Sequence, residues 1–359
     1  MNITVAGGGN IATQFAVHCA DKGNCVTIFT SKPDSFSKNL QIVNKDGAVL
    51  LSAQISCATS DAEKAFSKAD LIFVCVPSLC MKDFAEIIVP YVKKECAIIL
   101  VPGSGGGECA FKEALGKGCT IAGLQRVPSV ARIIEYGKSV RATGYRDELH
   151  LAAMPNKNTA SICKIVEGIF DIKCTPLPNY LNLTLTPSNP ILHTTRLRTV
   201  FKDYSDGVVY PRLPLFYEEW SDESSRLLLK CDEEVQSICK ALVDFDLSYV
   251  KSLKIHYESP TAEKMTEKIS SIEGFKGLKT PCREVDGGFI PDLTSRYFTA
   301  DFSFGLTIIK QIADFCSVST PNIDETLDWY EKICTVKNSF SFADYGVFNY
   351  DDFVKLYKL

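Results

Sequence analysis

The sequence predicts an α/β domain with a doubly wound parallel sheet, followed by a second domain that is all-α. Up to about residue 180, short apolar segments alternate with amphipathic ones, which is typical of β-α units around a parallel sheet. Pro176, Pro178 and Pro187 then interrupt the chain. From about residue 190 onward, apolar residues recur at helical spacing. We therefore expect two domains, residues 1–180 and 181–359.

The strands of the first domain are expected where the sequence is most apolar. Leu71–Pro77 and Ala97–Pro102 are apolar almost throughout, as expected for parallel strands that are buried on both faces. Both are far shorter than the roughly 20 residues that cross a bilayer. The expected strands are 2–6, 25–30, 70–76, 97–101 and 120–123, with further strands within residues 130–180. The expected helices are 10–22, 61–67, 80–93, 107–116 and 159–170.

The second domain is expected to consist of helices joined by loops. The segment 271–302 contains glycine, proline and several charged residues, and we expect it to be a long loop. Long ordered loops are often functional. The expected helices are 190–202, 213–244, 246–255, 261–270, 303–315, 321–333 and 349–358.

Composition excludes several classes of function. The net charge of −4 gives no electrostatic reason to expect a nucleic acid partner. The 15 cysteines are irregularly spaced and include no CxxC pair, so we expect reduced thiols rather than a disulfide framework or a metal site. No apolar leader precedes the first expected strand, and no segment is long enough to span a membrane. We expect a soluble, cytoplasmic protein.

The first chemical signal is a glycine-rich turn after the first expected strand. The turn has the spacing Gly7-x-Gly9-x-x-Ala12, and a helix is expected to follow it. Such a Rossmann turn lets the backbone approach a pyrophosphate, which then lies at the N-terminus of the helix. The alternative is a structural turn without a ligand. We assign cofactor binding to Gly7, Gly9, Asn10, Ile11 and Ala12.

The end of the second expected strand indicates which dinucleotide binds. NAD-binding proteins usually place a carboxylate there to hold the ribose 2′-hydroxyl. Here the strand ends in Thr30, Ser31 and Lys32, and the first carboxylate is Asp34. Two hydroxyls and a cation suit a 2′-phosphate, so NADP(H) is favoured over NAD(H). The alternative is that these are solvated turn residues.

Two further turns follow apolar strands at the same expected sheet edge. Val76 and Pro77 end one strand, and Gly103 lies in a glycine-rich loop after the next. In a doubly wound sheet this edge binds the ligand, so all three are candidates to contact the nicotinamide. A steric requirement of the turns would equally explain these residue types.

The second chemical signal is a pair of titratable residues in the helical domain. Asn189 is expected to cap a helix that begins with Pro190, which places His193 near the helix start. A positive helix end disfavours an imidazolium, so His193 would be available as a base. Asp301 can orient a histidine, and the guanidinium of Arg296 can bind a carboxylate through two hydrogen bonds. The alternatives are a buried structural histidine and an aspartate that caps a helix from residue 303.

Together these motifs resemble the opine dehydrogenase family, which includes octopine, nopaline and N-carboxyalkyl amino acid dehydrogenases. The resemblance covers nearly the whole chain. Its motifs are Gly7-x-Gly9-x-x-Ala12, Pro102-Gly103-x-x-Gly106-Gly107, Asn189-Pro190-x-x-His193-x-x-Arg196 and Arg296-Tyr297-Phe298-x-x-Asp301-x-x-x-Gly305-Leu306.

This resemblance implies an activity and roles for the residues. The family uses NAD(P)H to condense an α-keto acid, often pyruvate, reductively with the amino group of an amino acid. His193 and Asp301 occupy the positions of its catalytic dyad, and Arg296 matches a family arginine. We expect Arg296, Asn189 or polar groups near Gln125 and Arg132 to hold substrate.

Two other functions remain open on the sequence alone. One is an enzyme similar to ketopantoate reductase, which would reduce a 2-keto acid without an amine. The other is a non-catalytic regulator that binds NADPH. The sequence leaves open the identity of both substrates and the oligomeric state, with a homodimer as one candidate.

Overall fold

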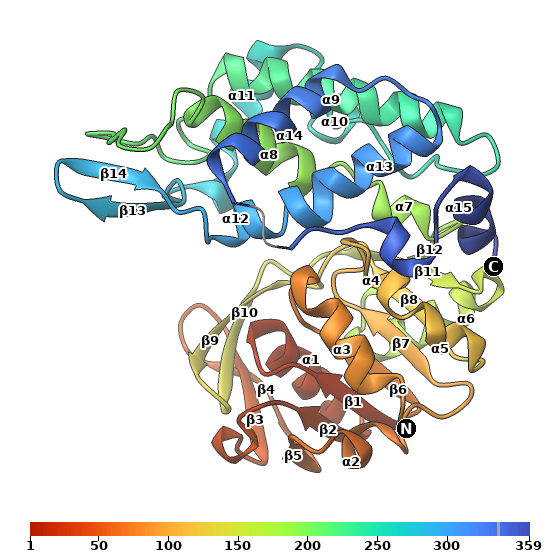
Figure 1. Ribbon diagram of the computed structural model, residues 1–359. Coiled ribbons are helices and arrows are strands. Elements are labelled where there is room, and N and C mark those ends of the chain that lie inside the picture. Colours follow the sequence, from red (N-terminus) through yellow and green to blue (C-terminus); the bar gives the residue numbers. More distant parts are fainter. Residues whose placement is uncertain (336–337) are drawn as a thin grey trace. The chain divides into compact units, whose positions relative to one another are not determined.

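The computed structural model describes residues 1–335 and 338–359 (Figure 1). By its contacts the chain divides into two units, of which the first comprises Met1–Thr184 with Val354–Leu359 and the second comprises Leu185–Phe353. The sequence predicts a boundary near residue 180 and a second domain that continues to residue 359. The structure instead groups the last residues of the chain with the first unit.

The first unit is built on an eight-stranded sheet with the order β12-β11-β8-β7-β6-β1-β2-β5. Neighbouring strands are parallel except for β11, which runs antiparallel to β8. The predicted doubly wound sheet is therefore present, with a mixed edge. The strands are β1 (Asn2–Ala6), β2 (Cys25–Phe29), β5 (Cys57–Thr59), β6 (Leu71–Val74), β7 (Ala97–Leu100), β8 (Thr120–Leu124), β11 (Glu148–Met154) and β12 (Lys173–Pro176).

A second sheet of four strands was not expected from the sequence. Its order is β4-β3-β10-β9, and its strands are β3 (Asn39–Val43), β4 (Val49–Gln54), β9 (Val130–Glu135) and β10 (Ser139–Thr143). Many of its side chains are exposed, so these strands lack the continuous apolar runs that identify the main sheet. The sequence therefore gives a weaker signal for this sheet.

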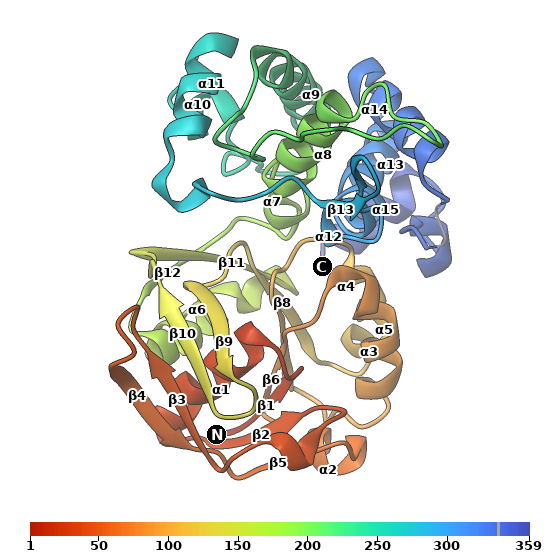
Figure 2. The ribbon, with the colours of Figure 1, turned by 90° about the vertical axis from the view of Figure 1, so that its left-hand side faces the viewer.

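Helix α1 (Asn10–Asp21) lies between the two sheets of the first unit (Figure 2). It contacts β1 and β2 on one side and all four strands of the smaller sheet on the other. The Phe15 ring packs edge-on against Phe73 and Phe170, with ring centroids 5.0 and 4.7 Å away. This burial fixes the helix, and with it the position of the helix N-terminus.

The other helices of the first unit are shorter. The predicted helix over residues 159–170 is confirmed as α6. The set comprises α2 (Ala62–Phe66), α3 (Met81–Ile88), α4 (Gly107–Ala110), α5 (Lys112–Gly116), α6 (Thr159–Phe170) and α7 (Leu181–Thr184).

A buried carboxyl group ties the end of the chain to the first unit. Glu108 is fully buried, and its Oε1 accepts hydrogen bonds of 2.7 Å from both the Thr184 and Tyr357 hydroxyls. The carbonyl of Leu359 accepts a hydrogen bond from the Asn156 N–H at 2.8 Å. Burial raises the pKa of Glu108, which favours its neutral form.

The second unit is helical, as predicted, although the predicted helices 213–244 and 246–255 are shorter in the structure. The predicted helix 213–244 begins only at Asp222, where the Ser221 side chain accepts from the Ser224 N–H. The helices are α8 (Asn189–Val200), α9 (Asp222–Ala241), α10 (Leu253–His256), α11 (Ala262–Ser271), α12 (Arg296–Thr299), the π-helix η5 (Phe302–Leu306), α13 (Thr307–Phe315), α14 (Pro321–Ile333) and α15 (Tyr350–Tyr357), the last of which continues into the first unit.

The expectation that this domain has helices alone is corrected by a hairpin inside the predicted loop 271–302. Strands β13 (Cys282–Val285) and β14 (Gly288–Pro291) are antiparallel. Val285 pairs with Gly288, so Asp286 and Gly287 form a two-residue turn. Gly287 has a φ of +85°. The dipeptide Asp286-Gly287 is a strong hairpin signal, and it is the feature of the sequence that predicts this element.

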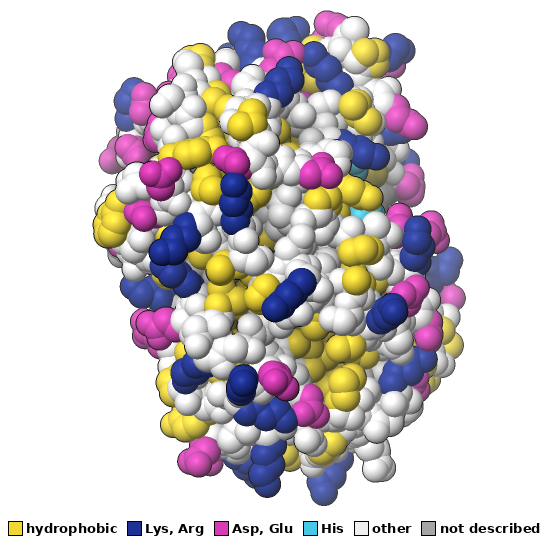
Figure 3. All heavy atoms as spheres, turned by 90° about the vertical axis from the view of Figure 1, so that its right-hand side faces the viewer, with side chains coloured by type: hydrophobic (Ala, Val, Ile, Leu, Met, Phe, Trp, Pro, Cys, Tyr) yellow, Lys and Arg dark blue, Asp and Glu magenta, His cyan; other side chains and the backbone are white. Residues whose placement is uncertain are grey.

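The surface carries charges of both signs. On the face shown in Figure 3, lysine and arginine side chains are interspersed with aspartate and glutamate. Among the described residues, no helix combines the length and the apolar character that crossing a membrane requires.

A buried aspartate lies in helix α9. Asp232 is 1% exposed, and its Oδ2 accepts a hydrogen bond from the Leu253 N–H at 2.9 Å. Burial raises its pKa from 3.8 to about 6. Between these two values the folded state binds more protons than the unfolded state, so the free energy of unfolding falls as the pH rises. The contribution to stability is complete below the lower value and lost above the higher one.

We predict that Asp232→Asn removes most of this pH dependence. The amide keeps an acceptor for the Leu253 N–H and cannot ionise. Between pH 4 and pH 7 the free energy of unfolding of the variant therefore rises by up to roughly 3 kcal/mol relative to that of the wild type. Urea unfolding across this range measures the difference. Glu233→Gln, which changes an exposed carboxyl on the same helix, serves as the control. Equal pH slopes for wild type and Asp232→Asn would contradict the prediction.

Candidate active site

The glycine-rich turn has the geometry of a phosphate cradle. Gly7 has a φ of +125°, and a Cβ there would lie 2.8 Å from the Cys75 carbonyl oxygen. Gly9 precedes α1, where no side chain caps the helix, and a Cβ on Gly9 would meet nothing within 4 Å. The first turn of α1 therefore has no side-chain cap, and the space beside Gly9 is open. A buried twelve-residue helix with a free N-terminus suits the pyrophosphate of a dinucleotide.

The next residues of the turn have structural partners in the first unit. Ala12 is fully buried, and its Cβ would lie 3.5 Å from a Cβ on Gly7. The Asn10 side-chain oxygen accepts a hydrogen bond from the Ile133 N–H at 2.7 Å. Ile11 is half-buried. Ala12 thus keeps the helix close to the strand, and the Asn10 side chain fixes β9 beside the turn.

The residues at the end of β2 surround the same turn. Thr30 is buried, whereas Ser31 and Lys32 are exposed. A Cβ on Gly8 would lie 2.7 Å from the Thr30 hydroxyl and 2.9 Å from the Tyr136 hydroxyl. The Lys32 ammonium lies 5.9 Å from the centre of the Tyr136 ring. Lys32 forms no ion pair with another residue in the part of the chain that the structure describes.

Tyr136 was missed by the sequence analysis. It lies between β9 and β10, and its hydroxyl reaches the phosphate turn from a sheet that was not predicted. No local motif surrounds it, so only the tertiary structure identifies it as a candidate cofactor contact.

The remaining candidates of the first unit lie at two places. Val76 and Pro77 follow β6, with Val76 buried and Pro77 exposed. Gly103 has a packing reason of its own, because a Cβ there would lie 2.6 Å from the Gly123 Cα. Its carbonyl also accepts a hydrogen bond from the Tyr180 hydroxyl at 2.9 Å. The steric explanation therefore accounts for Gly103 without a ligand.

Gln125 and Arg132 are not on the same sheet. Gln125 directly follows β8, and its N–H donates to the His150 carbonyl at 2.9 Å. Arg132 lies on β9, opposite Arg141 on β10, and its Nη1 donates to the Ala131 carbonyl. Only Gln125 ends a strand of the main sheet, where α/β proteins bind ligands.

In the second unit the structure joins the two residues of the predicted dyad. His193 Nδ1 lies 2.7 Å from Asp301 Oδ2. The side chain of His193 is 3% exposed and that of Asp301 is 16% exposed. The Asp301 carboxylate accepts a hydrogen bond from the Nδ1–H of His193, which fixes the tautomer and the orientation of the ring. His193 is thus a buried histidine with a carboxylate partner, as a general base requires.

Local structure explains how the dyad forms. Ser188, rather than the predicted Asn189, stands at the cap position of α8, and neither residue's side chain caps the helix. Asp301 precedes η5 but makes no side-chain cap hydrogen bond, so its carboxylate is available to His193. A Cβ on Gly305 would lie 2.9 Å from the Pro190 Cγ. Gly305 therefore permits the close approach of η5 and α8 that joins the dyad.

A tyrosine completes the group and was missed by the sequence analysis. The Tyr217 hydroxyl lies 2.7 Å from His193 Nε2, on the other side of the ring from Asp301. Because Nδ1 carries a proton toward Asp301, the neutral ring accepts at Nε2, and the Tyr217 hydroxyl donates. Burial is the main cause that raises the pKa of Tyr217 above its usual range.

Arg196 holds the segment that carries Tyr217. Its Nε donates to the Phe216 carbonyl at 2.9 Å, and its Nη2 donates to the Glu219 carbonyl at 2.6 Å. Its Nη1 donates to the Ser224 hydroxyl at 3.1 Å. Burial lowers the pKa of Arg196 to about 10, so the group stays charged at neutral pH. This explains why an arginine follows His193 by three residues in the sequence.

The two predicted substrate residues of this unit are exposed. Arg296 begins α12, and its guanidinium carbon lies 5.8 Å from the centre of the Tyr297 ring. Tyr297 in turn packs edge-on against His193, with ring centroids 4.4 Å apart. Asn189 begins α8, and its side-chain oxygen accepts from Ser188 at 3.5 Å. Arg296 therefore lies beside a ring that contacts the dyad.

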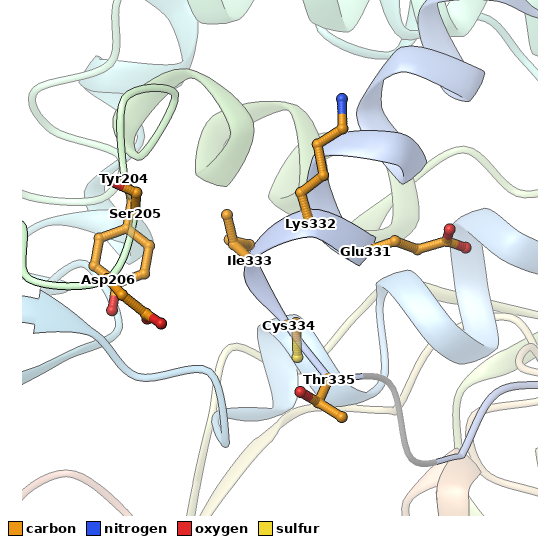
Figure 4. A pocket seen from close by; sticks show the side chains of 8 residues that line it. All are labelled: Tyr204, Ser205, Asp206, Glu331, Lys332, Ile333, Cys334 and Thr335. Atoms are coloured by element: carbon orange, nitrogen blue, oxygen red, sulfur yellow. The ribbon is translucent and has the colours of Figure 1, made fainter.

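Two pockets of the second unit lie outside the dyad. One, of about 670 Å³, has Tyr204 and Asp206 on one side and Lys332 and Cys334 on the other (Figure 4). The other, of about 250 Å³, is lined by residues 211–215 and by side chains of the segment 279–289. His193 and Asp301 line neither pocket, so we do not assign the dyad chemistry to them.

Two family models match the sequence. Residues 176–334 match the α-helical domain of NAD/NADP octopine and nopaline dehydrogenases. Residues 2–110 match the N-terminus of NAD-dependent glycerol-3-phosphate dehydrogenase. Tauropine dehydrogenase of Arabella iricolor is 27% identical, over 92% of this chain and 91% of its own length. Octopine dehydrogenase of Pecten maximus is 26% identical, over 92% and 90%.

Solved structures share the fold of the whole chain. Octopine dehydrogenase with NADH and pyruvate matches with a TM-score of 0.87 and 24% identity, covering 99% of this chain and 98% of that one. Yersinopine dehydrogenase with NADP⁺ matches with a TM-score of 0.67 and 12% identity, covering 92% and 90%. A ketopantoate reductase from Ralstonia eutropha JMP134 also matches, with a TM-score of 0.62, 14% identity and coverage of 92% and 97%.

We predict that Gly7→Ala weakens dinucleotide binding at least tenfold. An alanine at a φ of +125° is strained, and its Cβ would strike the Cys75 carbonyl, so we also expect a loss of roughly 1–3 kcal/mol of stability. Fluorescence titration with NADH and NADPH, together with thermal unfolding, measures both effects. Gly168→Ala in α6, where a Cβ meets nothing within 4 Å, is the matched control. Wild-type affinity in Gly7→Ala would show that the turn does not hold the cofactor.

Proposed function

We propose that this chain, which belongs to the opine dehydrogenase family, catalyses the NAD(P)H-dependent reductive condensation of an α-keto acid with the amino group of an amino acid. The observation that carries the proposal is the 2.7 Å hydrogen bond between His193 and Asp301. This pair gives a buried, oriented base in a domain of the helical octopine dehydrogenase type. Its relatives include tauropine and octopine dehydrogenases, and pyruvate is the keto acid that we test first.

The proposed roles follow from the chemistry of each group. The dinucleotide would be held by the turn Gly7–Ala12, and it supplies the hydride for the reduction. Arg296 would hold a substrate carboxylate through its forked donors. His193, oriented by Asp301, accepts a proton from the substrate ammonium so that the free amine can attack the keto carbon. Loss of water gives an imine, and its reduction gives a secondary amine.

Turnover that requires both substrates is the first test. We expect oxidation of NADPH or NADH only when pyruvate and a mixed pool of amino acids are both present, because the reduced bond forms by their condensation. Oxidation with a keto acid alone would instead indicate a ketone reductase similar to ketopantoate reductase. Cofactor binding without oxidation under any of these conditions would indicate the regulator.

The His193→Ala variant tests the catalytic role. We expect the rate of turnover to fall by at least about 100-fold, a typical contribution of acid–base catalysis, with cofactor affinity nearly unchanged. Absorbance at the nicotinamide band measures turnover, and fluorescence titration measures binding. Full activity in this variant would overturn the assignment of His193 as the base.

We further propose that NADPH is preferred to NADH. Support comes from Thr30, Ser31 and Lys32 at the end of β2, where NAD-binding proteins usually have a carboxylate. Lys32 is exposed and lies over the Tyr136 ring beside the phosphate turn. A cation in this position suits a 2′-phosphate.

Lys32→Ala therefore should discriminate between the cofactors. We predict that its KM for NADPH rises roughly tenfold through loss of a charge-assisted contact, while its KM for NADH changes little. Steady-state kinetics with each cofactor checks this, and Lys38→Ala, an exposed lysine on the same segment, is the control. Equal changes for both cofactors would count against a 2′-phosphate site at Lys32.

We also propose a reducing compartment such as the cytoplasm. All of the cysteines are free thiols in the structure, and many of them are buried. Buried thiols without disulfides suit a reducing environment.

A further inference from the structure

The dyad alone leaves one step of the proposed function without an explanation. A base must present a free lone pair to the ammonium of the substrate. His193 has two nitrogens, and both are already engaged, Nδ1 by Asp301 and Nε2 by the Tyr217 hydroxyl. His193 and Tyr217 are both buried, at 3% and 4% exposure, and the Tyr217 hydroxyl covers the one ring nitrogen that Asp301 does not bind. A proton that reaches His193 at Nε2 must therefore either displace Tyr217 or pass through it.

Tyr217 is fixed in place by its surroundings. Its ring stacks on Phe275, with ring centroids 4.1 Å apart and planes inclined by 20°. It also lies parallel to Trp220 on a longer spacing of 6.2 Å. The ring is 4% exposed, so a swing away from His193 would break buried contacts. Displacement is thus the more costly of the two routes.

Arg196 also holds the backbone on both sides of Tyr217. Its donors bind the carbonyls of Phe216 and Glu219, and its guanidinium carbon lies 5.3 Å from the centre of the Trp220 ring. These contacts join α8, which carries His193, to the segment that carries Tyr217. The spacing between the hydroxyl and Nε2 is therefore set by the same helix that positions the base.

We propose that Tyr217 is a further catalytic residue, whose hydroxyl relays the proton between the substrate amine and His193. The inference rests on the proposed function. In the forward direction the N–H bond of the ammonium breaks as the proton moves to the Tyr217 oxygen. In the same step the Tyr217 O–H bond breaks, and its proton forms a new bond to His193 Nε2. The amine keeps the electron pair of its N–H bond, and the charge ends on the imidazolium beside Asp301.

The surroundings of Tyr217 support a concerted transfer. Its raised pKa disfavours a tyrosinate, so the hydroxyl does not lose its proton before it gains another. Tyr297 packs edge-on against His193, with ring centroids 4.4 Å apart, and the Arg296 guanidinium carbon lies 5.8 Å from the centre of the Tyr297 ring. A substrate carboxylate on the exposed Arg296 would therefore lie beside a half-buried ring that contacts His193.

The test compares Tyr217→Phe with the wild type, His193→Ala and the double variant. Phenylalanine keeps the stacked ring and removes only the hydroxyl. We expect kcat to fall at least about 100-fold with little change in the KM of either substrate. The double variant should be no slower than His193→Ala, because the two groups act in one chain. Tyr330→Phe, which removes a buried hydroxyl bonded to Ser303 at 3.2 Å, should keep wild-type kcat.

Wild-type kcat in Tyr217→Phe, or losses that multiply in the double variant, would overturn the relay while leaving the condensation reaction established. Wild-type oxidation of the cofactor without an amine would instead overturn the proposed function, and the relay to an amine with it.

A second measurement does not depend on turnover. The chain has 4 histidines, so nitrogen NMR of ¹⁵N-histidine protein can resolve the His193 signals. We expect Tyr217→Phe to shift the Nε2 signal toward that of an unbonded nitrogen, while Tyr330→Phe leaves it unchanged. An unchanged Nε2 signal in Tyr217→Phe would overturn the relay even if no substrate pair had been found.

Discussion

The close approach of η5 to α8 is the constraint on which the site of the second unit depends. It places Asp301 and His193 within a hydrogen bond, although 108 residues separate them in the chain. Gly305 makes the approach feasible, because any larger residue would collide with Pro190. A proline at the start of one helix and a glycine in the facing turn therefore determine whether the base is oriented. This accounts physically for two motif residues that take no part in the chemistry themselves.

A buried cation gives the site its second fixed point. Arg196 is 3% exposed and is surrounded by backbone carbonyls and a hydroxyl rather than by a paired carboxylate. A charge in such a place costs solvation energy, which its hydrogen bonds must offset. An apolar side chain could fill the same volume but could not align three carbonyl-bearing residues at once. Arg196 therefore acts by fixing geometry, because its hydrogen bonds select one backbone path for the segment from Leu215 to Glu219.

The sequence predicts the parts of this site that depend on short spacings. The turn Gly7–Ala12 needs only local backbone requirements, and the dyad was found because each partner lies in a motif. Tyr217 and Tyr136 have no such surroundings, and each reaches its target through an element that was misjudged or not predicted. Residues 213–221 were expected to be helical, but Leu215 pairs with Lys279 and residues 216–219 form a turn, so α9 begins only at Asp222. Tertiary pairing overrides local helical spacing there.

The grouping of residues 354–359 with the first unit has a consequence for how the protein is made. A chain emerging from the ribosome presents the entire nucleotide-binding sheet long before Tyr357 exists to meet Glu108. Until residues 354–359 have been synthesised, that carboxyl lacks one of its two donors, and the Asn156 N–H lacks the Leu359 carbonyl that it binds. The first half of the molecule therefore cannot finish folding first, and its last contacts close only after the whole helical unit has been translated.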